Sequence, residues 1–521
     1  HFASFGGALC YLGGSMVRYA LGALTGTLYF LGWAGFDLWP LAFVAFVPMI
    51  IAIDPENDPD GAPLHWKRVF GVGFFAGLAM NIGGFYWLST TLQNFSGFSL
   101  PICTLLMILV CSYQALGLTL LALLYRYARV RLGLGNLGAA LIAMCFSEWV
   151  FPELFTKYFG AALHDLPLAI QVGDLGGPLL LSGLLIASSV AFYELYKLIR
   201  RQPFKRKRVV IIASAWAATL LYGAYRIHAV DTEAAASDQI TVGTVQTNMG
   251  LTQKRDDPEE GLQRHIDQTL ELMKTTKLDL LVWPESAFAW FLPDRIKNMR
   301  RIVFKDKIHI PTLFGGLSIR ERNKEIEPYN TAYMVDSDGD VVGTYDKTYL
   351  LAFGEYIPLG DRFPQLYDLS PHTGRFVSGK HVQPMPFGRY RLTALICYED
   401  VLPSFVSRAV RAGDPHLLVN MTNDAWFGDT HEPWQHLALA KLRAVEHHRA
   451  LVRSTNSGVT AIVDPVGRLM AVTGVFTREN IAAKVPMLEN GQYVYAYIGD
   501  WPGYLSLLAL LALSVLKRRK A

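Results

Sequence analysis

The sequence predicts a multispan α-helical membrane domain of about eight transmembrane helices, joined to an α/β sandwich domain outside the cytoplasm. Three observations support this fold class. Long apolar runs fill residues 1–230, whereas residues 231–500 have the mixed composition of a soluble domain. Basic residues gather at alternate ends of the apolar runs. The polar part alternates between strand-like and helix-like patterns.

The apolar runs account for the composition of the chain. Of its 521 residues, 51% are hydrophobic and 18% are charged, below the roughly 25% charged residues of soluble proteins. A transmembrane helix needs about 20 mostly apolar residues. We expect such helices near 17–34, 38–53, 68–90, 100–125, 136–155, 176–199, 208–228 and 502–516. The first 16 residues fit no element and lack the features of a cleavable signal peptide.

Charge predicts the orientation and the domain boundaries. Basic residues at 18, 67–68, 126–131, 200–208 and 517–520 fall at every second helix end, whereas the loops 35–39, 91–99 and 156–175 together carry one lysine. The positive-inside rule places the basic ends in the cytoplasm and the polar domain outside it. The expected domains are residues 1–230, 231–500 and 501–521. Because the basic clusters adjoin apolar runs, membrane topology explains them better than nucleic-acid binding.

The polar domain has the pattern of a layered α/β fold. Strands are expected near 240–245, 278–283, 310–316, 331–345, 391–396, 417–421 and 450–472. Turns interrupt the fourth and the last of these stretches at 336–339 and 464–467, and helices are expected at 257–275 and 433–447. Buried strands covered by helices follow from this alternation. Active groups in such folds tend to lie just beyond strand ends.

Three reactive side chains follow strand-like runs, namely Glu285, Lys347 and Cys397. Cys397 is the only cysteine between residues 231 and 500, so no disulfide partner is available there. A carboxylate can take a proton from a thiol, and an ammonium can stabilise the oxyanion that thiolate attack creates. This set predicts acyl transfer through a thioester. A structural salt bridge beside an inert thiol would give the same pattern.

Several motifs together resemble the nitrilase (carbon–nitrogen hydrolase) superfamily. They are Trp-Pro-Glu-Ser at 283–286, Tyr-Asp-Lys at 345–347, Phe-Gly-Glu-Tyr-Ile-Pro at 353–358, Ile-Cys-Tyr-Glu at 396–399 and Asn-Asp-Ala-Trp-Phe-Gly at 423–428. With helices on both sides of this domain, the whole chain resembles the bacterial apolipoprotein N-acyltransferase family. Supporting matches lie at 35–42, 433–436 and 453–459. The resemblance implies that the α/β domain is a nitrilase-like αββα sandwich.

The resemblance also implies roles for individual residues. The Glu-Lys-Cys triad of the superfamily corresponds to Glu285, Lys347 and Cys397, with Glu355 as a helper. The remaining implied site residues are Tyr398 and Glu399, which position the nucleophile, and Trp426 and Phe427, which belong to a substrate-guiding loop. No cofactor and no metal are expected.

One position departs from the family pattern. Arg255 stands where several family members have a tryptophan in a Leu-Lys-Trp stretch. Arg255 is expected to be a solvated loop residue, with contact to a lipid phosphate as the alternative.

The implied reaction has two steps. Cys397 takes an acyl chain from the sn-1 ester of a phospholipid of the phosphatidylethanolamine type, and the N-terminal amine of a diacylglyceryl-cysteine apolipoprotein then accepts it. The implied enzyme is a monomer of the bacterial inner membrane, with its catalytic domain in the periplasm and no nucleic-acid partner. Two other interpretations stay open: a membrane-tethered amidase or nitrilase that hydrolyses amides, and a scaffold or transporter with a non-catalytic nitrilase domain.

Overall fold

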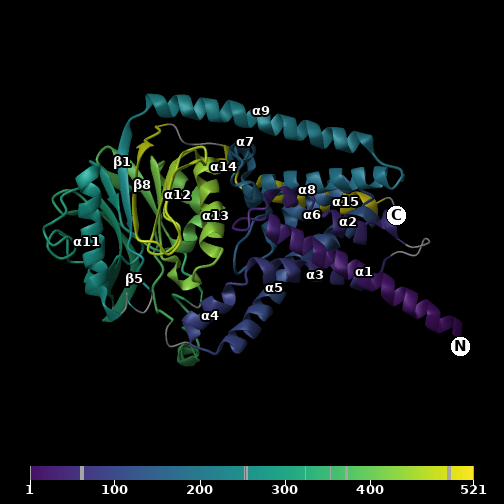
Figure 1. The fold of residues 1–521 in the computed structure, drawn as a ribbon, viewed down its shortest axis with the longest axis horizontal. Coiled ribbons are helices and arrows are strands. Elements are labelled where there is room, and N and C mark those ends of the chain that lie inside the picture. The colour runs from purple at the N-terminus through teal and green to yellow at the C-terminus, as the bar shows by residue number, and fades with distance from the viewer. Residues whose placement is uncertain are drawn as a thin grey trace. The chain divides into compact units, whose positions relative to one another are not determined.

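The computed structural model describes residues 2–58, 64–250, 253, 256–322, 324–352, 354–369, 373–489 and 494–519, with side chains from residue 15 onward. The chain forms two compact units (Figure 1). The helical unit comprises His1–Ser89, Pro101–Ala224 and Ile498–Ala521. The sheet unit comprises Thr90–Leu100 and Tyr225–Tyr497. Arg255 lies outside the described residues.

Each apolar segment predicted from the sequence overlaps a helix. These helices are α1 (Phe2–Gly32), α2 (Val47–Ile53), α3 (Trp66–Gly84), α5 (Leu100–Val130), α6 (Asn136–Val150), α8 (Gly173–Ile199), α9 (Arg206–Ala236) and α15 (Trp501–Arg518). Residues 2–16, which the sequence left unplaced, belong to α1. The short helix α7 (Pro167–Ile170) precedes α8.

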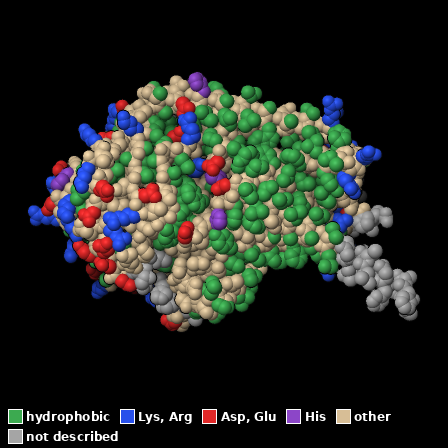
Figure 2. Space-filling model, viewed as in Figure 1, with side chains coloured by type: hydrophobic (Ala, Val, Ile, Leu, Met, Phe, Trp, Pro, Cys, Tyr) green, Lys and Arg blue, Asp and Glu red, His purple; other side chains and the backbone are tan. Residues whose placement is uncertain are grey.

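Among the described residues, α5, α8 and α9 are long and apolar enough to cross a membrane. A fourth span is possible if α3 and the following α4 (Leu88–Ser96) form one bent span. Because α4 extends to Ser96, most of the loop predicted at 91–99 is helical. Side chains such as Leu105 and Leu221 are 59% and 73% exposed. Figure 2 shows many hydrophobic side chains on the visible surface of the helical unit, as expected for helices that face lipid.

Ion pairs join several helix ends within the helical unit. Arg129, in the last turn of α5, lies 3.0 Å from Asp54 at the end of α2. Lys197, in the last turn of α8, lies 2.9 Å from Glu56 just after α2, and Arg208 in the first turn of α9 also pairs with α8. The basic ends of α5, α8 and α9 therefore lie close together, as the charge pattern predicts.

Two sheets form the centre of the sheet unit. The first has the order β13-β1-β2-β4-β5-β6, with β3 beside β4, and the second has the order β12-β11-β10-β9-β8-β7. The first sheet contains β1 (Gln239–Gln246), β2 (Leu280–Val282), β3 (Phe288–Pro293), β4 (Thr312–Arg322), β5 (Glu325–Val335), β6 (Val341–Asp346) and β13 (Glu479–Pro486). The second contains β7 (Met385–Phe387), β8 (Tyr390–Ile396), β9 (Leu417–Thr422), β10 (Ala450–Thr455), β11 (Ala461–Val463) and β12 (Leu469–Val472).

Helices cover both outer faces of this sandwich (Figure 1). Alternate residues of the first sheet face opposite sides: Leu280 packs in the core between the sheets, whereas Leu281 and Phe314 pack with α11 (Pro258–Thr275). The second sheet packs against α12 (Pro403–Gly413) and α13 (Glu432–His447). This αββα sandwich confirms the fold class expected for the polar domain. Strands β3, β7 and β13 and helix α12 were not predicted from the sequence.

Candidate active site

Glu285, Lys347 and Cys397 line one cavity in the sheet unit, with a volume of about 230 Å³. Glu285 lies shortly after β2, Lys347 directly after β6, and Cys397 directly after β8. Two of the residues therefore come from the first sheet and one from the second. The fold thus brings together side chains that are far apart in the sequence, since Glu285 and Cys397 are separated by 112 positions. Glu355 lines the same cavity.

Cys397 occupies a strained turn between β8 and the 3-10 helix η6 (Cys397–Val401), with φ of 53°. A left-handed conformation is costly for a residue with a side chain and persists where neighbouring contacts impose it. The buried Glu399 carboxylate supplies those contacts, because it accepts hydrogen bonds from the backbone N–H groups of Ile396 (2.8 Å), Thr348 (2.7 Å) and Tyr349 (2.9 Å). Glu399 thus ties the Cys397 turn to the segment after Lys347.

Buried contacts also fix the ammonium of Lys347. Its Nζ lies 2.8 Å from Glu355 Oε2 and 3.7 Å from Glu285 Oε1. The Asn330 amide donates hydrogen bonds to both carboxylates, at 2.9 Å and 2.7 Å. Burial alone lowers the pKa of Lys347, but the negative charges of Glu355 and Glu285 help to raise it above its usual value. Lys347 is therefore a permanent cation beside the nucleophile.

The thiol of Cys397 is protonated at neutral pH. Burial raises its pKa, and the positive charge of Lys347 offsets only part of this rise. Attack by this sulfur therefore requires a base that removes the proton during the reaction. The Glu285 carboxylate lines the same cavity and has the chemistry for this role.

The polar side chains of Ser286, Asn330 and Asn423 also line the cavity. Apolar side chains form much of the remaining wall, namely Phe95, Leu317, Leu351, Phe376, Trp426 and Phe427. Trp426 and Phe427 belong to the 3-10 helix η7 (Asp424–Phe427). The Trp426 ring stacks on Phe95 with centroids 4.1 Å apart and planes 7° apart. The described cavity lining omits Tyr398, whose ring lies 6.1 Å from that of Tyr349.

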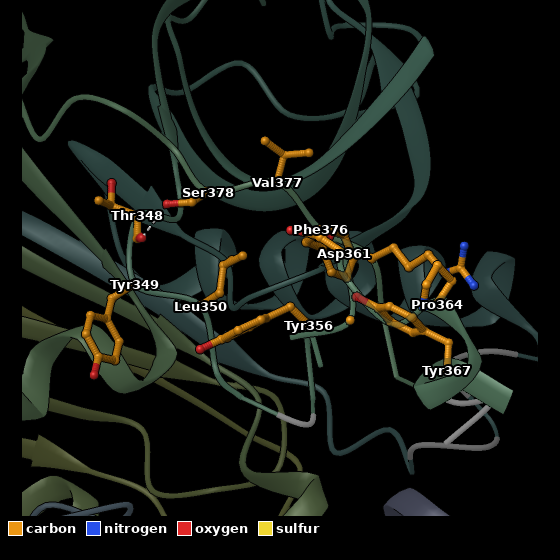
Figure 3. A pocket seen from close by; sticks show the side chains of 12 residues that line it. Thr348, Tyr349, Leu350, Tyr356, Asp361, Pro364, Tyr367, Phe376, Val377 and Ser378 are labelled. Atoms are coloured by element: carbon orange, nitrogen blue, oxygen red, sulfur yellow. Dashed lines mark hydrogen bonds between the residues drawn. The ribbon is translucent and has the colours of Figure 1, made fainter. Parts of the chain in front are cut away.

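A larger hollow of about 670 Å³ adjoins the segment after Lys347. Figure 3 shows Tyr349, Tyr356 and Tyr367 around it, and Phe376 lines both this hollow and the smaller cavity. Its described lining contains no member of the Glu285–Lys347–Cys397 set. Size alone would favour the larger hollow as a binding site. The candidate chemistry lies in the smaller cavity, where the nucleophile, the carboxylates and the ammonium converge.

Two family models match the chain. The model described as the apolipoprotein N-acyltransferase N-terminal domain matches residues 25–191. The carbon–nitrogen hydrolase model matches residues 241–493, which include every site residue predicted from the sequence.

Relatives that match over nearly the whole of this chain show which family it belongs to. The apolipoprotein N-acyltransferase of Azotobacter vinelandii is 32% identical over 97% of this chain and 95% of its own length. The chain belongs to the apolipoprotein N-acyltransferase family. The apolipoprotein N-acyltransferase of Geobacter metallireducens is 28% identical over 92% of each chain. The solved structure of Saccharomyces cerevisiae Nit3, a member of branch 10 of the nitrilase superfamily, aligns with 48% of this chain and 92% of its own, with TM-score 0.38 and 17% identity.

This apolipoprotein N-acyltransferase family member also has a buried ionic network that local sequence patterns did not indicate. His436 Nε2 lies 2.7 Å from Asp400, and Arg453 lies 3.2 Å from Asp400 and 2.8 Å from Asp424. Among the described residues, Asp424, Glu432 and His436 could together hold a metal ion. The Arg453 guanidinium already supplies a positive charge at Asp424.

The network reaches the turn of Cys397 and the η7 segment, both of which line the cavity. Arg453 donates a 2.8 Å hydrogen bond to the Asn420 side-chain oxygen, and the Asn420 amide donates to the Cys397 carbonyl at 3.0 Å. Asp424 begins η7, which carries Trp426. The sequence offered one sign of this network, because Arg453 lies within the strand-like run of β10 (Ala450–Thr455). A buried charge there requires a charged or hydrogen-bonding partner.

The first testable consequence is a pH-dependent stability through His436. Burial and Arg453 lower the pKa of His436, but Asp400 and Asp424 outweigh them and raise it to about 9. The pKa of a histidine in the unfolded chain is about 6.5. Between about pH 6.5 and pH 9, His436 is therefore protonated in the folded chain and largely neutral in the unfolded chain. This stabilisation is complete below about pH 6.5 and is lost as the pH rises through about 9.

Thermal unfolding of the detergent-purified chain between about pH 6 and pH 10 measures this effect. The His436→Gln variant is expected to lack the decline that the unaltered chain shows over that window. Parallel profiles for the two proteins would contradict the assignment, whatever the difference in their absolute stabilities.

A second prediction concerns the close packing of β4 against the Glu285 turn. A Cβ added at Gly315 would lie 2.7 Å from both the Glu285 Cα and the Pro284 carbonyl oxygen. Gly315→Ala must therefore displace Glu285. Because a misplacement of about 1 Å can cost about 10²-fold in rate, we expect a loss of kcat/KM of up to that order. The matched control is Gly316→Ala, whose Cβ would meet only side-chain atoms, at 3.3 Å or more. Equal kcat/KM values for the two variants would contradict this account.

Proposed function

We propose that this chain transfers an acyl group from the sn-1 position of a phospholipid of the phosphatidylethanolamine type to the N-terminal amine of a diacylglyceryl-cysteine apolipoprotein. The acyl group passes through a thioester on Cys397. The main support is the convergence of Glu285, Lys347 and Cys397 on one cavity in a member of the apolipoprotein N-acyltransferase family.

In the first half-reaction, Glu285 takes the proton of Cys397 as the sulfur attacks the ester carbonyl carbon. Lys347 and a backbone N–H near Cys397 stabilise the oxyanion. The carbon–oxygen bond to glycerol then breaks, and Glu285 returns its proton to the leaving alcohol. A lysophospholipid leaves, and the acyl group stays on sulfur. The permanent charge of Lys347 and the protonated thiol both fit this sequence of events.

In the second half-reaction, the amine of the acceptor attacks the thioester carbonyl. Glu285 removes a proton from the amine, Lys347 again stabilises the oxyanion, and the carbon–sulfur bond breaks as the thiol regains a proton. Glu355 holds Lys347 in place through its 2.8 Å contact. Glu399 and Tyr398 position the turn of Cys397, and Trp426 and Phe427 guide the acyl chain along the apolar wall.

The proposal includes placement in the bacterial inner membrane, with about eight spans and the catalytic sheet unit in the periplasm. Among the described residues, three helices of sufficient length and apolarity support the membrane location. The basic ends of α5, α8 and α9 lie close together and would face the cytoplasm under the positive-inside rule. A membrane location gives the enzyme direct access to a donor and an acceptor that both carry acyl chains.

Purified protein with sn-1-labelled phosphatidylethanolamine and a synthetic diacylglyceryl-cysteine peptide tests the proposal. We expect labelled N-acyl peptide and unlabelled lysophospholipid. A peptide whose amine is acetylated is the matched control and should accept no label. Free fatty acid without acylated peptide would indicate a hydrolase, and no reaction would indicate a non-catalytic scaffold; either result would contradict the proposal.

A further inference from the structure

One wall of the catalytic cavity comes from a distant part of the sequence. Phe95, near the end of α4, lines the cavity with the Glu285–Lys347–Cys397 set. It belongs to the sheet unit through the segment Thr90–Leu100. Phe95 lies within the N-terminal family match at 25–191 and outside the carbon–nitrogen hydrolase match at 241–493. The hydrolase part of the chain thus lacks this wall by itself.

Several contacts hold Phe95 against the loop that carries Trp426 and the loop that carries Glu355. Its ring stacks on Trp426 with centroids 4.1 Å apart. The neighbouring Asn94 amide donates a 3.0 Å hydrogen bond to the Trp426 carbonyl. A Cβ added at Gly354, beside Glu355, would lie 3.5 Å from the Phe95 ring. Phe95 therefore fills the space between the Trp426 loop and the Glu355 loop.

A thioester in this cavity faces a competing reaction. Glu285, which is placed to deprotonate an amine, is equally placed to deprotonate water. In hydrolysis the water oxygen would bond to the acyl carbon, the carbon–sulfur bond would break, Glu285 would carry the water proton to sulfur, and a fatty acid would leave. A transferase must keep water from the acyl-enzyme until the amine arrives.

We propose that the Phe95–Trp426 stack excludes water from the Cys397 thioester and so determines the partition between transfer and hydrolysis. This inference rests on the proposed function and deepens it. Phe95 touches no reacting atom through a polar group, so it is a specificity-determining residue of the cavity wall. The two rings are in contact, so no water molecule fits between them, and the ring faces are apolar. The N-terminal region would thereby convert a hydrolase-like site into a transferase site.

The test measures the lifetime of the acyl-enzyme. The protein is first acylated with labelled phosphatidylethanolamine, and the remaining donor is removed. Loss of the thioester and release of labelled fatty acid are then measured over time, first without acceptor and then with the diacylglyceryl-cysteine peptide. Phe95→Ala is expected to shorten the thioester lifetime severalfold, because the opened wall lets water reach the acyl carbon. The fraction of label released as fatty acid should rise by a similar factor when acceptor is present.

Three further variants separate the stack from general damage. Phe98→Ala removes an exposed ring of the same segment that is absent from the cavity lining and should leave the lifetime unchanged. Phe95→Tyr keeps the ring and should restore the lifetime. Trp426→Ala should match Phe95→Ala, and the double variant should add little, because both remove one stack.

The inference fails if Phe95→Ala forms thioester with the lifetime and hydrolysed fraction of the unaltered chain, or if Phe98→Ala shortens the lifetime equally. It also fails if the two single-variant effects simply add in the double variant. Absence of thioester in the unaltered chain would overturn the proposed function itself, and this inference with it.

Discussion

Cys397→Ala is expected to reduce acyl transfer by at least about 10³-fold, because no other side chain of the catalytic cavity can carry the acyl group as a thioester. The variant should keep its fold. The side chain that is removed is small and lines a cavity, and Glu399 still accepts its hydrogen bond from the Ile396 N–H. Turnover of labelled phosphatidylethanolamine into N-acyl peptide measures the loss.

Cys145→Ala is the matched control for Cys397→Ala, because it removes a buried thiol from the helical unit. It should retain near-normal turnover and thermal stability. Substantial activity in Cys397→Ala would refute the assignment of the nucleophile, and an equal loss in Cys145→Ala would indicate damage to the fold rather than to the chemistry.

Glu285→Gln is expected to lower kcat by about 10²- to 10⁴-fold, the usual contribution of a general base. The substitution keeps the size of the side chain and leaves an oxygen that can accept the hydrogen bond from Asn330. Because the pKa of Cys397 is raised, few thiolates exist without a base at neutral pH. The loss should therefore shrink as the pH rises and hydroxide removes more of the thiol protons.

Glu327→Gln serves as the control for Glu285→Gln, since Glu327 accepts a hydrogen bond from Tyr329 and is absent from the cavity lining. Its kcat should match that of the unaltered chain at every pH. A Glu285→Gln variant that keeps full activity at neutral pH would remove Glu285 from the mechanism.

Local sequence patterns predicted most strands of the sandwich and placed Glu285, Lys347 and Cys397 after strand-like runs, whereas their roles as a triad were implied by the family resemblance. Runs of β-branched and apolar residues ended just before Glu285, Lys347 and Cys397, and the structure has β2, β6 and β8 there. Apolar length likewise indicated the helices of the helical unit. These signals are local, since each depends on composition and period within one element.

Other features depend on contacts between distant residues. Strand β13 (Glu479–Pro486) carries charged residues and pairs with β1, so its apolar pattern is weak. The pairing of Arg453 with Asp400 and Asp424 brings together residues from separate loops and strands. Phe95 lay in a segment predicted to be a loop, and no local pattern could show that its ring meets Trp426.

The most direct test of the central claim is detection of the acyl group on Cys397. The unaltered chain is incubated with sn-1-labelled phosphatidylethanolamine without acceptor, digested at low pH and analysed by mass spectrometry. We predict an acyl mass on the peptide that contains Cys397, which hydroxylamine removes and which the acceptor peptide discharges as N-acyl product. Label on another residue, or acyl transfer at full rate without any adduct on Cys397, would contradict the account.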